Sequence, residues 1–161
     1  MMPMTILTFK DWILTVDHES TKSTYAAVEN GSAEDCNCND CLNYILNRDN
    51  IFPEQVKHLF NQLGVDYHKE SEVWRMCKEN NCIHRYSVIF HFKGSFEGTD
   101  CLVILNNGTQ TTKLNPITDS FKIGFTKGDD LVYFKDKNDL IQIEIEIMAP
   151  WAIDKMLESE W

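Results

Sequence analysis

Residues 140–148 read LIQIEIEIM, in which apolar and polar side chains alternate from residue 141 to residue 147. Isoleucines occupy positions 141, 143, 145 and 147, and Gln142, Glu144 and Glu146 stand between them. Because successive side chains of a β-strand point to opposite faces of its sheet, this pattern predicts a strand with one buried face and one solvated face. A sheet covered on one face only is typical of antiparallel pairing.

The same period of two recurs upstream of this strand. The segments EVWRMCKE (72–79) and HRYSVIFHF (84–92) flank NNCI (80–83), whose asparagines predict a hairpin turn. The second segment has two faces: Tyr86, Val88, Phe90 and Phe92 on one, and Arg85, Ser87, Ile89 and His91 on the other, wetter one. We expect His91 to be solvated. Shorter strands are predicted at CLVIL (101–105), SFKIGFT (120–126) and LVYF (131–134), with a loop at NNGTQTTKLNP (106–116).

The N-terminal part predicts a strand pair and then two helices. WILTVD (12–17) alternates as a strand, HESTK (18–22) supplies a turn, and STYAAVE (23–29) returns. The first helix begins near residue 39 and buries a stripe formed by Leu42, Ile45 and Leu46. Pro53 opens the second helix and Gly64 ends it, around a stripe formed by Val56, Leu59, Phe60 and Leu63. After Pro150, WAIDKMLESEW (151–161) predicts a short helix anchored by Trp151.

Strands at both ends with helices between them predict an α+β fold rather than an alternating βαβ fold. A chain of 161 residues with no linker or internal repeat predicts one domain, residues 1–161. The two central helices either cover one face of the antiparallel sheet or cap the end of a sandwich.

The charge balance excludes some functions. The 25 Asp and Glu side chains outnumber the 15 Lys and Arg, and the formal net charge is −10. Nucleic-acid binding relies on a surplus of Lys and Arg, so DNA or RNA is not an expected partner. The same charge argues against anionic membranes and is compatible with a basic protein partner. Acidity also favours solubility without any partner.

The N-terminus, MMPMTILTFKDWILTVDHES (1–20), has no basic start, and Lys10, Asp11 and Asp17 interrupt its apolar residues. Neither a signal peptide nor a transit peptide is therefore expected. The apolar runs of the chain are too short to span a bilayer. We expect a cytoplasmic location, where cysteines stay reduced.

Three of the six cysteines lie in EDCNCNDCLNY (34–44), at Cys36, Cys38 and Cys41. Thiolates are preferred zinc ligands, and a structural zinc site holds four nitrogen or sulfur ligands in a tetrahedron. The three cysteines are therefore candidate zinc ligands at the start of a helix. The fourth ligand would be one of Cys77, Cys82, His84 or His91. The usual spacing is only half met, because Cys77-x4-Cys82 is a loose second pair.

Two other roles fit the same cysteines. Cys38 and Cys41 have the C-x-x-C spacing of thiol oxidoreductases, and a helix N-terminus lowers a thiol pKa. No βαβ unit precedes them, however, and the neighbouring aspartates repel a thiolate. In the remaining interpretation, Asn39 or Asp40 caps the helix and Cys41 packs as a small apolar residue. Cys101 is expected in the core in every interpretation.

Motifs that mark enzymes are missing from the sequence. It contains no G-x-G-x-x-G or G-x4-G-K-[ST] phosphate loop, no H-E-x-x-H zinc motif and no G-x-S-x-G nucleophile elbow. Glu144 and Glu146 share a strand face roughly 6–7 Å apart. That distance overlaps the separation of glycosidase carboxylates, but any acidic strand face has it.

Several segments together resemble a family of small uncharacterised bacterial proteins: EDCNCNDCLNYILNRDNIFPEQVKHLFNQLGVDYHKESEVWRM, YSVIFHFKGSFEG, FKIGFT and IQIEIEIMAPW. The pattern is a C-x-C-x-x-C-x-[NY] start, a helix after F-P that ends in L-G-[IV]-D, and a closing P-W, over about residues 34–151. The resemblance implies a bacterial origin and adds no catalytic residue. It directs attention to Cys36, Cys38 and Cys41, and leaves Cys77 and Cys82 outside the pattern.

Three functional hypotheses follow. The missing enzyme motifs and the acidic charge favour a small intracellular binding or regulatory module without catalytic activity, similar to immunity proteins that neutralise basic nuclease toxins. The first alternative is a zinc-binding protein that uses Cys36, Cys38 and Cys41. The second alternative is an enzyme that acts from a pocket between the helices and the sheet.

Overall fold

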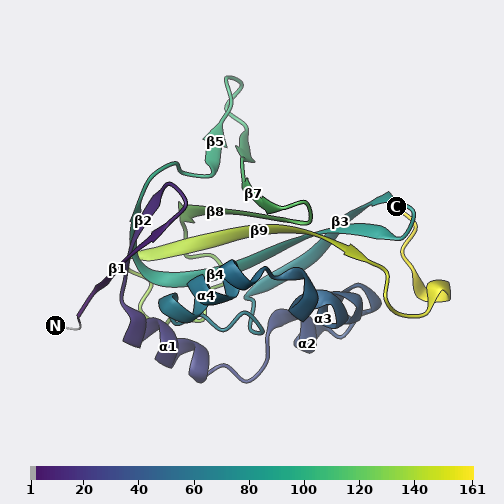
Figure 1. Cartoon of the computed structure of the whole chain (residues 1–161), viewed down its shortest axis with the longest axis horizontal. Coiled ribbons are helices and arrows are strands. Elements are labelled where there is room, and N and C mark those ends of the chain that lie inside the picture. The colour runs from purple at the N-terminus through teal and green to yellow at the C-terminus, as the bar shows by residue number, and fades with distance from the viewer. Residues whose placement is uncertain (1–2) are drawn as a thin grey trace.

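The computed structural model describes residues 3–161, and its elements form an α+β fold (Figure 1). The helices within these residues are α1 (His18–Ala26), α2 (Ser32–Cys36), α3 (Asn39–Ile51), α4 (Glu54–Leu63) and the short 3-10 helix η1 (Lys155–Leu157). The strands are β1 (Thr5–Phe9), β2 (Trp12–Val16), β3 (Glu72–Asn80), β4 (Ile83–Glu97), β5 (Leu102–Ile104), β6 (Gln110–Thr112), β7 (Asn115–Thr118), β8 (Phe121–Lys127) and β9 (Leu140–Pro150). The α+β class and the antiparallel sheet are confirmed.

The long strand β4 organises the large sheet. Seven strands form this sheet in the described residues, in the order β1-β2-β4-β9-β8-β7, with β3 also pairing with β4. β4 has 15 residues, enough to pair with β9 along one edge and with β3 and then β2 along the other. Strands β5 and β6 form a separate two-stranded sheet.

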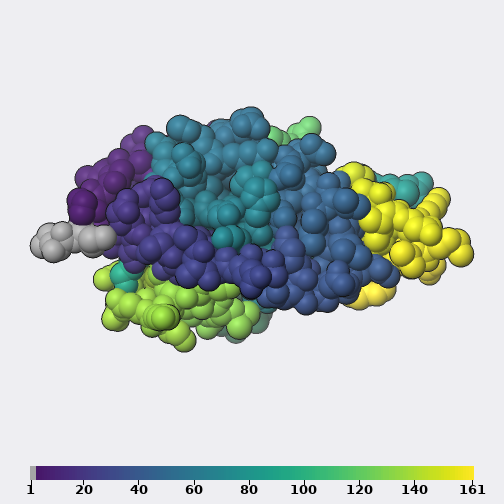
Figure 2. All heavy atoms as spheres, turned by 90° about the horizontal axis from the view of Figure 1, so that it is seen from below, coloured from purple at the N-terminus to yellow at the C-terminus, as the bar shows by residue number. Residues whose placement is uncertain are grey.

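The core lies between the large sheet and the helices. The four isoleucines of β9 are at most 1% exposed, and they pair in register with four buried residues of β4: Tyr86, Val88, Phe90 and Phe92. The helices lie below the sheet in Figure 1, and the view from below in Figure 2 shows residues 18–63 spread over this face. The helices therefore cover one face of the sheet, which was one of the two predicted arrangements.

The predicted turn at 18–22 and the return strand at 23–29 are wrong, because residues 18–26 form helix α1 and residues 27–29 are not in a strand. The partner of β2 is instead β1, on its N-terminal side. Asp17 caps α1 by accepting the Ser20 N–H at 3.0 Å. The Tyr25 hydroxyl then bonds both the N–H and the C=O of His91, at 3.0 and 3.1 Å. Helix α1 thus provides hydrogen-bond partners for backbone groups of β4 at the place where neither β3 nor β2 pairs with it.

Helix α4 confirms its prediction, whereas α3 exposes a different face from the one predicted. Gly64 ends α4 with a left-handed φ of 88°, and the predicted apolar stripe of α4 is buried. In α3, Leu42 and Leu46 are exposed by 37% and 56%. The buried face is largely polar, because Asn43 and Asn47 donate to the Pro150 carbonyl and so satisfy the end of β9. Among the described residues, no helix is long and apolar enough to cross a membrane.

Three smaller predictions need correction. The predicted loop at 106–116 contains β6 and the start of β7. The segment 131–134 is not a strand; Phe134 is buried there, and the Tyr133 hydroxyl donates to the Glu70 carbonyl at 2.5 Å. The C-terminal helix is only the three-residue η1, although Trp151 does pack on His84, with ring centroids 5.1 Å apart.

Candidate metal centre

The cysteine cluster (Cys36, Cys38 and Cys41) lies where α2 ends and α3 begins. Cys36 is the last residue of α2, and Asn37 reverses the chain in a left-handed conformation with φ of 57°. Asparagine adopts this conformation more readily than most residues. Cys38 is then the N-cap of α3, and its sulfur accepts the Cys41 N–H at 3.5 Å. The cap is therefore a cysteine, and not Asn39 or Asp40 as expected.

The three sulfur atoms lie within 4.8 Å of one another. Three thiolates around one zinc ion lie about 3.8 Å apart, by the Zn–S bond length and the tetrahedral angle. Small side-chain rotations therefore suffice to bring the sulfurs to a common ion. Cys36 and Cys38 are exposed and Cys41 is buried, so an ion here would lie at the surface with one protected ligand.

The thiols of the cluster differ in acidity. Hydrogen bonding to the Cys38 backbone, and then to the Cys38 and Cys41 thiols, lowers the pKa of Cys36. Burial, and then hydrogen bonding to the Cys38 and Cys36 thiols, raises the pKa of Cys41. Since the thiolate is the form that ligates metal, Cys36 becomes available as a ligand at lower pH than Cys41. Asp40 raises the pKa of Cys36 as expected, but this effect is smaller than that of the hydrogen bonds.

Within the described residues, the cluster contains no fourth histidine, cysteine or carboxylate ligand. Cys77 donates to Glu79, and Cys82 lies in the β3–β4 turn with φ of 62°. His84 is fully buried and its Nε2 contacts Glu158 at 2.7 Å. All six cysteines of the chain are free, and Cys101 is buried as expected.

The expected solvation of His91 is wrong, because this side chain is only 1% exposed. It lies on the helix-free face, where neither ring nitrogen has a hydrogen-bond partner within residues 3–161. Burial lowers the pKa of His91 to about 4, so the ring is neutral at pH 7. The sheet face that was predicted to be solvated is therefore buried from solvent around His91.

A second cluster, the Arg48 network (Glu34, Arg48 and Glu70), ties α2 to α3. Arg48 of α3 contacts Glu34 of α2 at 2.8 Å and Glu70 at 3.1 Å. Glu70 is fully buried, and its carboxylate accepts the Ala33 N–H at 3.1 Å, which satisfies the start of α2. Burial raises the pKa of Glu70 to about 7, in spite of the opposing effects of Ala33 and Arg48. This network was not predicted from the sequence, because charged residues that lie far apart in the chain form no recognisable pattern.

The C-terminal segment contacts the start of α3 near the cysteine cluster. The Asp40 carboxylate accepts the Ser159 hydroxyl at 2.8 Å and lies 3.3 Å from Nε of Arg75. The Arg75 guanidinium also lies 4.9 Å from the ring centroid of Trp161. Figure 2 shows this segment in yellow beside the helices. Arg75 therefore supplies a positive charge next to Asp40, which adjoins Cys41 in sequence.

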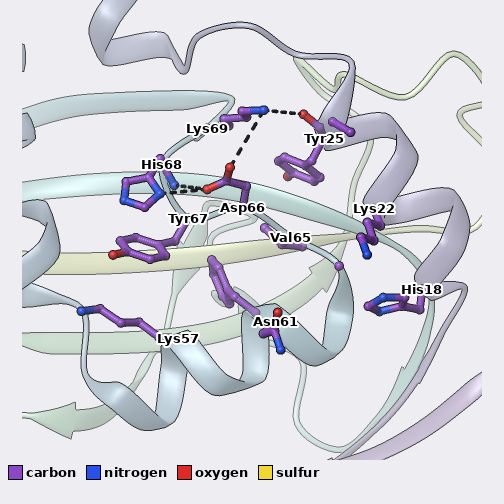
Figure 3. Close-up of a pocket in the computed structure, with 13 residues that line it drawn as sticks. His18, Lys22, Tyr25, Lys57, Asn61, Val65, Asp66, Tyr67, His68 and Lys69 are labelled. Atoms are coloured by element: carbon purple, nitrogen blue, oxygen red, sulfur yellow. Dashed lines mark hydrogen bonds and ion pairs between the residues drawn. The ribbon is translucent and has the colours of Figure 1, made fainter.

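A surface groove of about 430 Å³ lies between α1, α4 and residues 65–69 (Figure 3). His68 stands at its edge, with Nδ1 3.0 Å from Asp66 and Nε2 3.0 Å from Asp49. Lys69 donates to the Tyr25 carbonyl at 2.9 Å. Because both ring nitrogens of His68 are engaged, neither is free to serve as a general base in this arrangement. His68 is therefore not placed as a general acid or base in this groove, and it does not support the hypothesis of an enzyme.

Comparison of the chain with protein-family models, curated proteins and solved structures finds no match in any of the three. The resemblance to a family of small bacterial proteins therefore stays a proposal. In the cysteine cluster, the structure brings together the three cysteines that the sequence predicts as metal ligands.

Proposed function

We propose that this protein is a binding module whose ligand is a thiophilic metal ion held by Cys36, Cys38 and Cys41. The supporting observation is that three sulfurs from one short segment lie within 4.8 Å of one another. Three thiolates form a strongly sulfur-rich site, and thiolates select zinc, copper(I) or iron–sulfur clusters over hard cations. A cytoplasmic location fits the proposal, since it keeps thiols reduced.

Zinc is the preferred ion in this proposal. It accepts three protein ligands together with one ligand from solvent or a partner, and it needs no particular geometry from its d electrons. Two of the sulfurs are exposed, so a fourth ligand can approach from outside. The ion would link the end of α2 to the first turn of α3 and stabilise that junction.

Metal analysis of protein purified without chelator tests this proposal. We expect about one zinc per chain, since three thiolates with an open fourth position bind zinc strongly. Cys38→Ser should abolish binding, and Cys77→Ser, outside the cluster, is the matched control. A zinc content below about 0.2 per chain after zinc loading, or equal loss in both variants, would refute the proposal.

A protein-interaction role is the second candidate, and the net charge of −10 favours it. In this proposal the protein binds a basic partner, as immunity proteins bind nuclease toxins, and the complementary charges accelerate the encounter. The interaction should weaken as salt is added, because the charges are screened. Copurification of one defined basic protein from the source cells, lost at high salt, is the expected result. Recovery of no specific partner at low salt would count against the role.

A further inference from the structure

Residues 101–112, here called the arm, form a β-hairpin that stands away from the rest of the molecule. Figure 1 shows it rising from the side of the large sheet opposite the helices. Among the strands that the structure describes, β5 and β6 pair only with each other. An isolated two-stranded hairpin is marginally stable in water, and three or more strands are usually needed. The arm therefore has the form of an incomplete sheet.

The arm exposes apolar side chains and carries no charge. Ile104 is 68% exposed, Leu105 46% and Leu102 38%. Residues 101–112, CLVILNNGTQTT, contain no Asp, Glu, Lys, Arg or His, in a chain whose net charge is −10. Two copies of this chain repel each other because each has a large negative net charge. The repulsion is weakest for contact through the arm, because the arm is uncharged and holds the remainder of the two molecules apart. The lack of charge therefore removes the electrostatic barrier to a second copy of this chain at the arm.

Backbone groups of β5 are also free to pair. The N–H of Leu105 donates to the Thr109 carbonyl at 2.8 Å, and the Cys101 carbonyl accepts from Lys113 at 2.8 Å. In an antiparallel strand the backbone groups of successive residues point to opposite edges. The N–H and C=O groups of residues 101, 103 and 105 therefore point toward β6, and those of Leu102 and Ile104 point to the free edge. The Leu102 N–H is held by the Asp100 carboxylate at 2.8 Å. The outward groups left to an additional strand are the Leu102 carbonyl and both groups of Ile104.

We propose that β5 pairs antiparallel with β5 of a second copy, about a two-fold axis at Val103. Ile104 of each copy then lies opposite Leu102 of the other, and its N–H donates to that leucine carbonyl. The four strands β6-β5-β5-β6 form one continuous sheet, with four exposed apolar side chains brought together on one face. This interface is isologous, the commonest kind in protein dimers. Cross-strand apolar pairs and new backbone hydrogen bonds stabilise it.

The edge strand β1 is the competing surface. It carries Ile6, which is 70% exposed, and it is uncharged as well. However, β1 already belongs to a seven-stranded sheet and needs no further strand for stability. Pairing through β1 would also bring the two acidic bodies side by side, which pairing through the arm avoids.

Sedimentation velocity over a wide range of protein concentration tests the proposal. We expect a dimer that dissociates on dilution and tightens as salt is added, because salt screens the repulsion between the acidic bodies. Ile104→Lys should weaken dimerisation about tenfold or more, since symmetry places the substitution in two cross-strand pairs. Ile6→Lys, equally exposed and on the competing edge, should leave it unchanged.

Three results would overturn the proposal. A monomer at every protein and salt concentration would show that no dimer forms. Dissociation by Ile6→Lys but not by Ile104→Lys would assign the dimer to β1. A dimer that loosens with salt would indicate charge pairing instead of strand pairing. Near-ultraviolet circular dichroism of each variant establishes that it is folded before the comparison is made.

Discussion

Glu70→Gln tests the role of the Arg48 network through the pH dependence of stability. Burial raises the pKa of Glu70 from its ordinary 4.5 to about 7. Between these values the folded protein holds a proton on Glu70 that the unfolded chain has released. The free energy of unfolding therefore falls as the pH rises through this window, by about 1.4 kcal/mol per pH unit. The total from Glu70 is about 3 kcal/mol.

Glutamine removes this titration but keeps an acceptor for the Ala33 N–H. From pH 4.5 to above pH 7, the wild type should therefore lose about 3 kcal/mol more unfolding free energy than Glu70→Gln loses. The assay is guanidinium unfolding across this range, with reductant and chelator to keep the cysteine cluster free of metal.

Glu54→Gln is the matched control, because the Glu54 side chain is 91% exposed and pairs with Lys57 at 3.4 Å on the surface. Its unfolding free energy should follow the wild-type pH dependence closely. Parallel curves for wild type and Glu70→Gln would show that Glu70 is ionised throughout, with Arg48 offsetting the cost of burial. That result would contradict a raised pKa for Glu70.

Three further substitutions test how α1 and α4 are held. Tyr25→Phe should lower the unfolding free energy by about 1–3 kcal/mol, because the backbone groups of His91 lose their partner; urea unfolding measures the loss, and a value near zero contradicts the bridging role. Asp17→Ala should cost about 1 kcal/mol in the same assay, through loss of the α1 cap to Ser20, whereas Asp17→Asn should restore most of it. Gly64→Ala should cost about 1–2 kcal/mol, because φ is 88° and an added Cβ would lie 2.8 Å from the His18 carbonyl oxygen; thermal unfolding checks this, and an unchanged midpoint would refute it.

The sequence was informative where one physical signal decided the local structure. The alternation in 140–148 predicted β9 and its buried face, and the Pro53 and Gly64 boundaries predicted α4, because a half-covered strand and an amphipathic helix each need an apolar period. It failed for α1, whose buried residues Thr21 and Tyr25 are polar and bond the edge of β4. A helix that satisfies backbone groups in this way lacks the apolar stripe by which helices are recognised.

The same difference explains what could be predicted of the candidate site. The spacing of Cys36, Cys38 and Cys41 sufficed to predict their proximity, because all three lie within six positions of one segment. Spacing could not show whether Cys77, Cys82, His84 or His91 joins them. That depends on how β3 and β4 pack against α3, and neither helix packing nor strand pairing can be read from ligand spacing.

The geometry of the cysteine cluster depends on residues far from it in sequence. α2 has only five residues, and a helix of one turn does not persist in water without tertiary contacts. Its start is held by the Glu70 carboxylate, and its Glu34 is held by Arg48 from α3. A Cβ on Gly31 would collide with that carboxylate, so the close approach requires glycine there. Cys36 ends α2 and Cys41 lies in the first turn of α3, so the Arg48 network fixes the angle between the two helices whose ends carry the thiols. Loss of the network should therefore separate Cys36 from Cys41 and weaken metal binding, even though no member of it is a metal ligand.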